Sequence, residues 1–236
     1  IPRVGDVIMS GARKMHMFHL PMLRVGRYNP NPEFLFIKRL FDIILSLIAI
    51  IILSPIMIVV AFLIKVTDKG PVLYKQCRLT KNGKQFMVLK FRSMRVDAEK
   101  DGVARLSSGD KDDRITPIGK FIRKVRFDEL PQLFNILFGD MSIVGPRPLL
   151  VQYLERYNEE QKHRHDVKPG LTGLAQVNGR NGITWEEKFH YDLEYVKNIT
   201  FYGDCKIIFQ TVMKVFGREG ISSATSVTME EFKGNK

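Results

Sequence analysis

Asp128 and Glu129 form the carboxylate pair in this sequence that is best placed to do chemistry. They follow a cation-rich segment, residues 120–126, and precede a rigid Gly-Pro-Arg-Pro turn that carries Arg147. An ionised aspartate among arginines can act as a nucleophile toward phosphorus, because the cations offset the charge that develops there. Glu129 could bind a Mg²⁺ ion that also holds substrate phosphates. The simpler alternative is that Asp128 only caps a helix predicted over residues 128–138.

The sequence contains no other phosphate-binding or metal-binding pattern. Neither GxxxxGK[ST] nor GxGxxG occurs, so phosphates would have to be bound by cationic side chains and helix ends. His163 and His165 do not share a helix face, and we interpret them as surface or packing residues. Cys77 and Cys205 have no metal or redox spacing, which favours reduced thiols.

The charge balance indicates a polyanionic partner. The 37 Lys and Arg residues exceed the 25 Asp and Glu residues by 12. Such an excess fits nucleic acid, an anionic membrane face or a phosphate-rich substrate. Composition alone does not choose among the three.

An uncharged apolar run from Ile43 to Ile64 indicates a membrane segment. As a helix it would be roughly 33 Å long, about the thickness of the hydrocarbon core of a bilayer. Pro55 lies within the run, and cations flank both ends, with Lys38 and Arg39 before it and Lys65 after it. Cations mark the cytoplasmic side, so a helix-break-helix hairpin that enters and leaves by the same face fits best. A kinked helix that spans the membrane is the alternative.

The elements after the membrane segment are typical of a mixed α/β domain. Strands are predicted over residues 72–79 and 84–94, joined by a tight turn at the Asn-Gly dipeptide 82–83. Lys90 and Arg92 share one face of the second strand, where solvation is the alternative to ligand binding.

Helices are predicted to make up most of the remaining domain. The expected helices cover residues 128–138 and 149–162, a segment opened by a capping box of Thr184 and Glu187, and an amphipathic segment over residues 201–216. Residues 95–114 are predicted to form a loop. The amphipathic segment could pack inside the domain or lie on the membrane surface.

Five motifs together resemble the bacterial sugar transferases, the monotopic polyprenyl-phosphate glycosyl-1-phosphate transferases. The motifs are FIKRLFD (Phe36–Asp42), LKFRSM (Leu89–Met94), RFDELPQLFNIL (Arg126–Leu137), GDMSIVGPRPLL (Gly139–Leu150) and KPGLTGLAQVNGRN (Lys168–Asn181). They occur in the family's order, and the resemblance extends from Phe36 to the C-terminus.

The resemblance implies an activity and a mechanism. Members of the family move a sugar 1-phosphate from a UDP-sugar to undecaprenyl phosphate and release UMP, which starts surface polysaccharide or glycoconjugate assembly. By that pattern Asp128 is the nucleophile that forms a covalent phosphosugar intermediate, and Glu129 helps to bind Mg²⁺.

The resemblance also implies the substrate-binding and anchoring residues. The substrate-binding residues would be Lys90, Arg92, Arg123, Arg147, Gln176, Asn178 and Arg180. The membrane anchor would comprise Lys38 and Arg39 together with the Ser54-Pro55 break, and the segment would be re-entrant. Residues before Phe36 are similar to the junction of large family members, whereas those from Gly145 onward are similar to small members that use acetamido sugars. The donor sugar therefore stays open.

We therefore expect a mixed α/β, mostly helical protein. Residues 1–35 would be a linker or the tail of a missing region, residues 36–69 a re-entrant membrane helix, and residues 70–236 a cytoplasmic catalytic domain with a small β-hairpin and membrane-surface amphipathic helices. Inner-membrane lipids are expected partners, nucleic acid is not, and the oligomeric state is open, with a dimer as one alternative. Two rival functions remain: a basic membrane-docked binding module without catalysis, and an enzyme whose lipid substrate attacks directly while Asp128 only binds metal.

Overall fold

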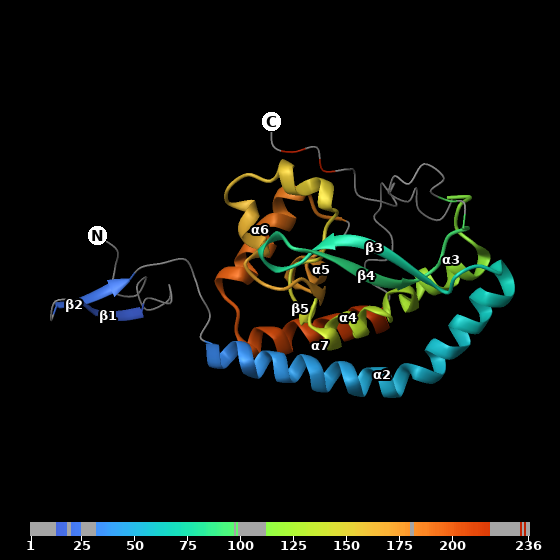
Figure 1. Cartoon of the computed structure of the whole chain (residues 1–236), viewed down its shortest axis with the longest axis horizontal. Helices are drawn as coiled ribbons and strands as arrows, with labels where there is room; N and C mark the ends of the chain where they lie inside the picture. Colours follow the sequence, from blue (N-terminus) through green and yellow to red (C-terminus); the bar gives the residue numbers. More distant parts are fainter. Residues whose placement is uncertain are drawn as a thin grey trace.

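The chain forms a mixed α/β structure that is mostly helical (Figure 1). The computed structural model describes residues 13–17, 20–24, 32–96, 98, 112–179, 182–217, 232 and 234. Its elements in chain order are β1 (Arg13–Met17), β2 (Leu20–Arg24), α2 (Pro32–Asp68), β3 (Leu73–Leu79), η1 (Lys81–Gly83), β4 (Gln85–Phe91), α3 (Pro117–Lys124), η2 (Phe127–Glu129), α4 (Gln132–Phe138), β5 (Ser142–Val144), η3 (Val151–Arg156), η4 (Gln161–His165), β6 (Gly170–Thr172), α5 (Leu174–Val177), α6 (Trp185–Lys197) and α7 (Phe201–Gly217).

The predicted membrane segment is one continuous helix of 37 residues, α2. The expected break at Ser54 and Pro55 does not divide it into two helices, although the helix bends along its course in Figure 1. Pro55 has no N–H to donate to the carbonyl of Ile51, four residues earlier. The Ser54 hydroxyl donates to that same carbonyl at 2.8 Å. The side chain thus replaces the bond that proline removes, and the helix continues.

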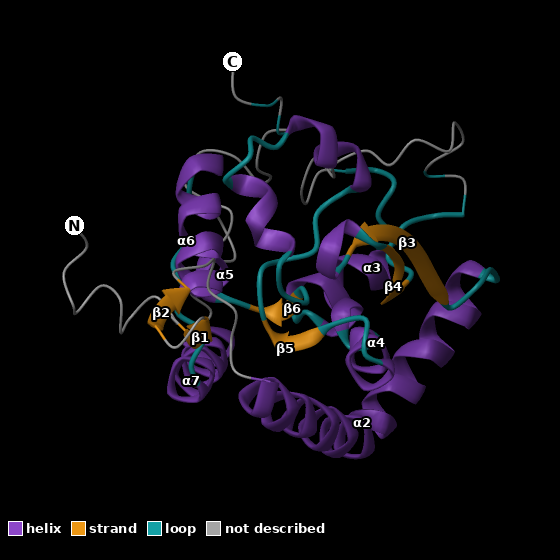
Figure 2. Cartoon of the chain, turned by 60° about the vertical axis from the view of Figure 1, so that its left-hand side comes forward, coloured by secondary structure: helices purple, strands orange, loops and turns teal. Residues whose placement is uncertain are grey.

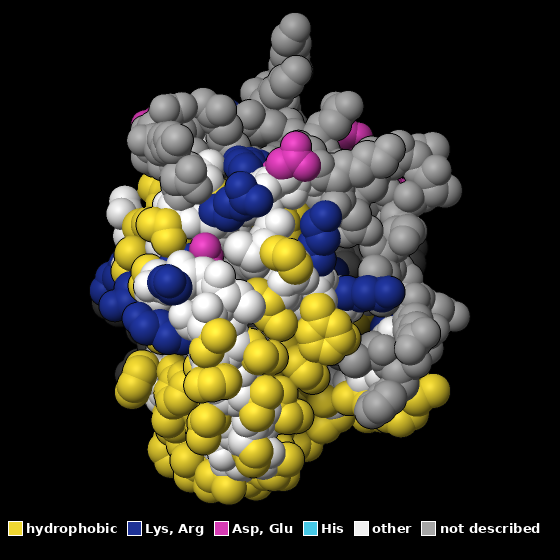
Figure 3. Space-filling model, turned by 90° about the vertical axis from the view of Figure 1, so that its right-hand side faces the viewer, with side chains coloured by type: hydrophobic (Ala, Val, Ile, Leu, Met, Phe, Trp, Pro, Cys, Tyr) yellow, Lys and Arg dark blue, Asp and Glu magenta, His cyan; other side chains and the backbone are white. Residues whose placement is uncertain are grey.

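The exposure pattern of α2 differs from that of a soluble amphipathic helix, because much of its apolar surface is exposed. Its buried residues include Asp42 and Ser46, whereas apolar residues such as Ile58 and Phe62 are 68% and 66% exposed. A soluble helix buries its apolar stripe and exposes its polar one. By length and composition, α2 is the one helix among the described residues that could cross a membrane. Figure 3 shows hydrophobic side chains gathered at the lower end of the molecule, below a band of Lys and Arg.

The predicted β-hairpin is confirmed in its pairing and in its turn. Strands β3 and β4 pair antiparallel, with Arg78 opposite Phe86. Asn82 and Gly83 both adopt positive φ in the turn, at 60° and 70°. Asn82 tolerates that region better than most residues, and Gly83 adopts it without steric cost. Phe86 of β4 packs in a core that includes α4 and part of α2.

Two short strands in the middle of the domain were not predicted. β5 pairs parallel with β6, with Ser142 opposite Gly170 and Val144 opposite Thr172. The Gly170 N–H, at the start of β6, also donates to the carbonyl of Pro146, beyond the end of β5, at 3.0 Å. The Gly-Pro-Arg-Pro turn directly follows β5, which lies beside β6 in Figure 2.

The helix predictions for the C-terminal half are confirmed in part. α6 begins at the predicted capping box of Thr184 and Glu187, and α7 covers the predicted amphipathic segment. The single helix predicted over residues 149–162 is confirmed only in part, because the chain forms two separate 3₁₀ helices, η3 and η4, there. Tyr153 and Tyr157 from this region enter an aromatic core with Phe189 of α6, and this packing overrides the local helical pattern.

Two further predictions concern the N-terminal segment and the loop after the β-hairpin. Strands β1 and β2 pair antiparallel within the segment expected to be a linker. Most of the loop expected over residues 95–114 lies outside the described residues.

Candidate active site

The Asp128-Glu129 pair lies in a tight 3₁₀ turn and not at the start of a helix. η2 spans Phe127–Glu129, and α4 begins only at Gln132. Arg126, just before the turn, adopts left-handed backbone with φ 65° and ψ 17°. A non-glycine residue pays about 1–2 kcal/mol in this region, so the surrounding structure must hold the turn in place. The predicted capping role of Asp128 is therefore wrong.

Glu129 is fixed by two cations from different elements. Its Oε1 accepts a hydrogen bond from Nη2 of Arg147 at 2.7 Å and one from Nζ of Lys90 at 3.3 Å. Burial alone would raise the pKa of Glu129, but the charges of Arg147, Lys90 and Arg126 outweigh burial and hold that pKa well below its ordinary value. Glu129 is therefore ionised, and its position is set by β4 and by the turn after β5.

Asp128 has the opposite environment. Its side chain is buried, and its Oδ1 atom has no hydrogen-bond partner. Burial, and next the negative charge of Glu129, raise the pKa of Asp128, while Lys90, Arg126 and Arg123 oppose the rise. A carboxylate that is desolvated and not bonded at one oxygen is more basic and more nucleophilic than a solvated one.

Arg147, which the resemblance assigns to substrate binding, contacts the pair through Glu129. It follows β5, and the charge of Glu129 is the largest influence on the Arg147 guanidinium, whose pKa is raised. Arg123 donates from Nε to the Ser93 hydroxyl at 2.7 Å. Burial lowers the pKa of Arg123, and the charge of Asp128 partly offsets this effect. Lys90, Arg123 and Arg147 thus all surround the carboxylate pair.

Two further cations reach the site, and neither was a predicted site residue. Burial and the charge of Arg147 lower the pKa of Arg78 to about 10, with Glu129 acting in the opposite direction. The charges of Asp128 and Glu129 both act on the guanidinium of Arg126. Sequence reasoning missed Arg78 because only the register of β3 against β4 and its bridge to Leu150 bring it to the turn. Five cations around two carboxylates leave an excess of positive charge, which suits a diphosphate substrate.

Arg92 is not brought to the carboxylate pair. Its guanidinium is buried and lies 2.9 Å from Asp68, at the end of α2. Strand β4 ends at Phe91, so the alternation that would have placed Arg92 beside Lys90 stops before it. The Arg92 contact joins the end of the long helix to the hairpin.

The loop residues predicted to bind substrate have other contacts. Gln176 donates to the Leu171 carbonyl at 2.9 Å, and Asn178 donates to the Leu174 carbonyl at 3.0 Å. Oε1 of Gln176 is buried without a hydrogen-bond partner. Arg180 lies outside the described residues. A substrate role for these three residues stays a prediction.

The carboxylates can accommodate a magnesium ion only together with substrate oxygens. Among the described residues no group of three or more His, Cys, Asp or Glu side chains could hold a metal. Mg²⁺ is commonly bound by one or two carboxylates plus phosphate oxygens and water. The ionised carboxylate of Glu129 fits that pattern.

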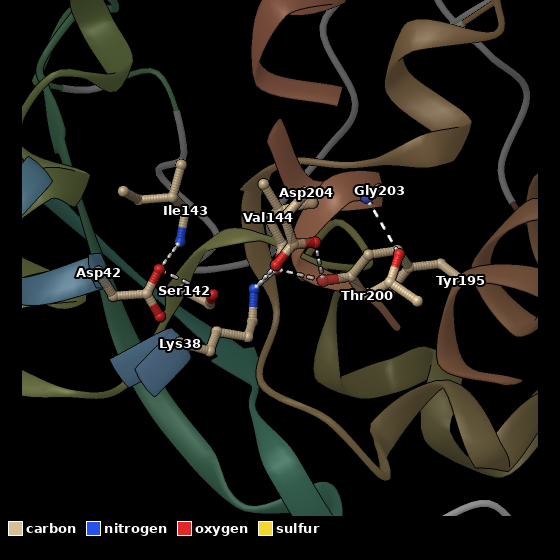
Figure 4. Close-up of polar contacts among 9 residues, drawn as sticks. All are labelled: Lys38, Asp42, Ser142, Ile143, Val144, Tyr195, Thr200, Gly203 and Asp204. Carbon is tan, nitrogen blue, oxygen red and sulfur yellow. Dashed lines mark hydrogen bonds and ion pairs between the residues drawn. The ribbon is translucent and has the colours of Figure 1, made fainter. Parts of the chain in front are cut away.

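The N-terminal end of α2 is bonded to the elements that carry the site (Figure 4). Lys38 lies 2.5 Å from Asp204 of α7 and donates to the Val144 carbonyl of β5 at 3.2 Å. Asp42 accepts from the Ser142 hydroxyl at 3.1 Å and from the Ile143 N–H at 2.9 Å.

The neighbouring anchor residue binds a different element. Arg39 donates to the carbonyls of Ile136 and Leu137 at 2.6 Å and 2.8 Å, at the C-terminal end of α4. A cation there is favoured by the helix dipole and by carbonyls that have no partner within the helix. The two predicted anchor cations are therefore bonded to the domain itself.

Comparison with known proteins identifies relatives over most of the chain. A family model described as bacterial sugar transferase matches residues 34–218. The chain is 45% identical over 199 residues to an uncharacterized sugar transferase, EpsL, of Bacillus subtilis, a match that covers 84% of this chain and 96% of EpsL.

Two longer relatives carry names that state a reaction. A UDP-glucose:undecaprenyl-phosphate glucose-1-phosphate transferase of Klebsiella pneumoniae is 47% identical over 187 residues, which cover 76% of this chain and 40% of that protein. An undecaprenyl-phosphate galactose phosphotransferase of Salmonella typhimurium is 44% identical over 213 residues, covering 84% of this chain and 44% of that protein. The chain thus spans less than half the length of both.

Proposed function

The chain belongs to the bacterial sugar transferase family, and on that basis we propose that it transfers a sugar 1-phosphate from a UDP-sugar to undecaprenyl phosphate. The observation that carries this proposal is the contrast within the carboxylate pair. Glu129 is held by Arg147 and Lys90, whereas Asp128 is buried with an unbonded oxygen. Relatives named for this reaction support the substrate class.

The first step is an attack by Asp128 on the phosphorus that carries the sugar. A bond forms between Oδ1 of Asp128 and this phosphorus, and the bond from phosphorus to the bridging oxygen breaks. UMP leaves with the electron pair of that bond. Cations such as Arg123 and Arg126, whose charges act on Asp128, offset the charge on the diphosphate during the attack.

The second step transfers the sugar phosphate to the lipid. An oxygen of undecaprenyl phosphate attacks the same phosphorus, and the acyl-phosphate bond to Asp128 breaks, which regenerates the carboxylate. The products are UMP and a lipid diphosphate sugar, and no net proton transfer is required. Mg²⁺, when bound, would supply charge neutralisation for the departing UMP, and Glu129 is the residue that would hold it.

We propose that α2 enters and leaves the membrane by the cytoplasmic face. Contacts at both ends of the helix support this arrangement, because Lys38 near one end and Asp68 at the other bind the same domain. The ends of a spanning helix would lie on opposite sides of a hydrocarbon core about 30 Å thick. Exposed apolar residues on the other helices, such as Phe138 at the end of α4 and Phe209 on α7, suit contact with lipid in the same layer.

UMP release tests the reaction. Purified protein in nanodiscs would be given undecaprenyl phosphate, Mg²⁺ and, in turn, UDP-glucose, UDP-galactose, UDP-GlcNAc, UDP-GalNAc and a UDP-bacillosamine donor. We expect UMP release with at least one donor and its loss in Asp128→Asn, while Asp113→Asn, which changes an exposed carboxylate, retains it. Addition of EDTA tests the proposed Mg²⁺ requirement.

The covalent step has its own test. Intact-protein mass spectrometry with donor but without lipid should detect a sugar-phosphate adduct on wild type and none on Asp128→Asn. Turnover without any adduct would instead favour direct attack by the lipid, with Asp128 as a metal ligand.

Labelling of single cysteines tests the membrane arrangement. In a Cys77→Ser/Cys205→Ser background, Glu33→Cys and Lys69→Cys would place thiols at the two ends of α2. A membrane-impermeant maleimide should label neither position in intact spheroplasts and both positions in inverted vesicles. Labelling of one position in each preparation would show that the helix spans the membrane.

A further inference from the structure

We infer that Arg164 is a positioning residue for Arg147. Arg164 is 2% exposed, on η4, and forms an ion pair with buried Asp192 of α6 at 2.7 Å. Its Nη2 also donates to the main-chain carbonyl of Arg147 at 2.8 Å. The guanidinium of Arg147 in turn binds Glu129 at 2.7 Å. A chain of directional bonds therefore leads from α6 to the carboxylate pair.

The main chain around Arg147 is held by two backbone hydrogen bonds and by one from the side chain of Arg164. The Gly145 N–H donates to the Thr172 carbonyl at 2.9 Å, and the Pro146 carbonyl accepts from Gly170 at 3.0 Å. Beyond Pro146 the bond to Arg147 comes from the side chain of Arg164 and not from β6. Prolines on both sides of Arg147 stiffen the turn, so a shift of the carbonyl also moves the guanidinium.

The planar guanidinium of Arg164 holds both partners at once. Nε and Nη2 of Arg164 both bond Oδ2 of Asp192, at 3.1 Å and 2.7 Å, while Nη2 also reaches Arg147. The rings of Tyr157 and Phe189, each 5.8 Å from the guanidinium carbon, bound it on other sides. A lysine ammonium is a point charge with fewer donors and no planar fork, so it cannot reproduce this set.

Stability alone is a weak explanation for the ion pair. The desolvation of two buried charges cancels most of their attraction, and apolar replacement of such pairs is often neutral or stabilising. The ion pair with Asp192 fixes Nη2 of Arg164 so that it donates to the main-chain carbonyl of Arg147. The consequence for activity rests on the proposed function, whereas the consequence for the Arg147 segment does not.

The test compares three variants with wild type by UMP release and by hydrogen exchange of peptides over residues 142–150. Arg164→Lys keeps the charge, and Arg164→Met/Asp192→Leu removes both charges of the ion pair together. Phe189→Leu is the matched control, because it loosens the same core without removing a bond to Arg147. A displacement of about 1 Å costs ~100-fold in rate, so we expect kcat to fall roughly 10- to 100-fold in both Arg164 variants, with KM changed less. Amide hydrogen exchange over residues 142–150 should be faster than in wild type in both Arg164 variants.

A double-mutant comparison separates positioning from general loosening. In an Arg147→Ala background, Arg164→Lys should cause no further loss of kcat, because Arg164 acts on the carboxylate pair through the Arg147 guanidinium, which this background lacks. Three outcomes would overturn the inference. The losses of kcat in the double variant could be multiplicative, the hydrogen exchange over residues 142–150 could equal that of wild type, or Phe189→Leu could have the same effects as the Arg164 variants. If wild type released no UMP, the proposed function would fail, and the exchange measurement would still decide whether Arg164 holds this segment.

Discussion

Glu129 and Asp128 are adjacent in the chain but have opposite electrostatic environments. Glu129 accepts hydrogen bonds from Arg147 at 2.7 Å and Lys90 at 3.3 Å, which together with nearby charge keep its pKa low. Oδ1 of Asp128 is buried without a partner, and burial raises its pKa. Glu129 is therefore stabilised as an ion and Asp128 is not, so replacing the two carboxylates should change the stability of the fold in opposite directions.

Asp128→Asn should abolish activity and leave the fold as stable as wild type or more so. A nucleophile that forms a covalent bond contributes at least ~10³-fold to turnover. Because the pKa of Asp128 is raised in the folded state, its contribution to stability is present below the unfolded pKa and lost as pH rises through the folded pKa. The Tm advantage of the variant should therefore grow as pH rises through that range. A variant clearly less stable at neutral pH would contradict this account.

Glu129→Gln should lower both activity and stability. The low pKa of Glu129 means that its contribution to stability is present above the unfolded pKa and is lost as pH falls through the folded pKa. Removing one partner of a fully buried ion pair costs about 3–5 kcal/mol. Since the Arg147 side chain is 34% exposed, we expect about 1–3 kcal/mol at neutral pH, measured by thermal unfolding in nanodiscs. Equal stability of Glu129→Gln and Asp128→Asn would contradict the opposite electrostatic environments of the two carboxylates.

The acid limb of the pH–rate profile should report Asp128. Protonation of a nucleophile with a raised pKa stops turnover at a pH above that expected for an ordinary aspartate, about 3.9. Lys90 is the cation that most strongly opposes this rise, so Lys90→Met should move the acid limb of kcat to higher pH in addition to slowing the reaction. Lys120→Met, which changes an exposed lysine on α3, should leave the limb in place.

Ser54 should matter to α2 only while Pro55 is present. The Ser54 hydroxyl donates to the Ile51 carbonyl, which Pro55 leaves without a backbone donor. Ser54→Ala should lower thermal stability in nanodiscs by about 1 kcal/mol, and Ser54→Ala/Pro55→Ala should cost less because the backbone N–H returns. Thr67→Val is the control, since Thr67 also bonds a carbonyl one turn earlier but no proline has removed that carbonyl's partner. An equal loss in the single and double variants would contradict this role.

Arg92→Gln should weaken the fold more than substrate binding. Arg92 lies against Asp68 and not against the carboxylate pair. We expect a lower Tm, with KM for the UDP-sugar within about 2-fold of wild type, whereas Arg147→Gln should raise KM or lower kcat strongly because Arg147 contacts Glu129 directly. A large rise in KM for Arg92→Gln with an unchanged Tm would restore its predicted substrate role.

The features that the sequence determined by itself are those set by neighbouring residues. The apolar run at α2, the Asn82-Gly83 turn and the capping box of Thr184 depend on local hydropathy, backbone freedom and side chains three residues apart. The sequence also identified the carboxylate pair and Arg147 as candidates, since their types and order are visible without coordinates.

Tertiary structure alone decided which charges meet. Asp128 lies in a 3₁₀ turn and not at a helix start, Arg78 reaches the site through strand pairing, and Arg92 turns away to Asp68. The structure likewise shows that α2 continues through Pro55, where the Ser54 hydroxyl bonds the Ile51 carbonyl. Electrostatic energies vary steeply with distance and burial, and both are set by packing between segments far apart in the chain. For that reason the pKa values of the two adjacent carboxylates shift in opposite directions only in the folded protein.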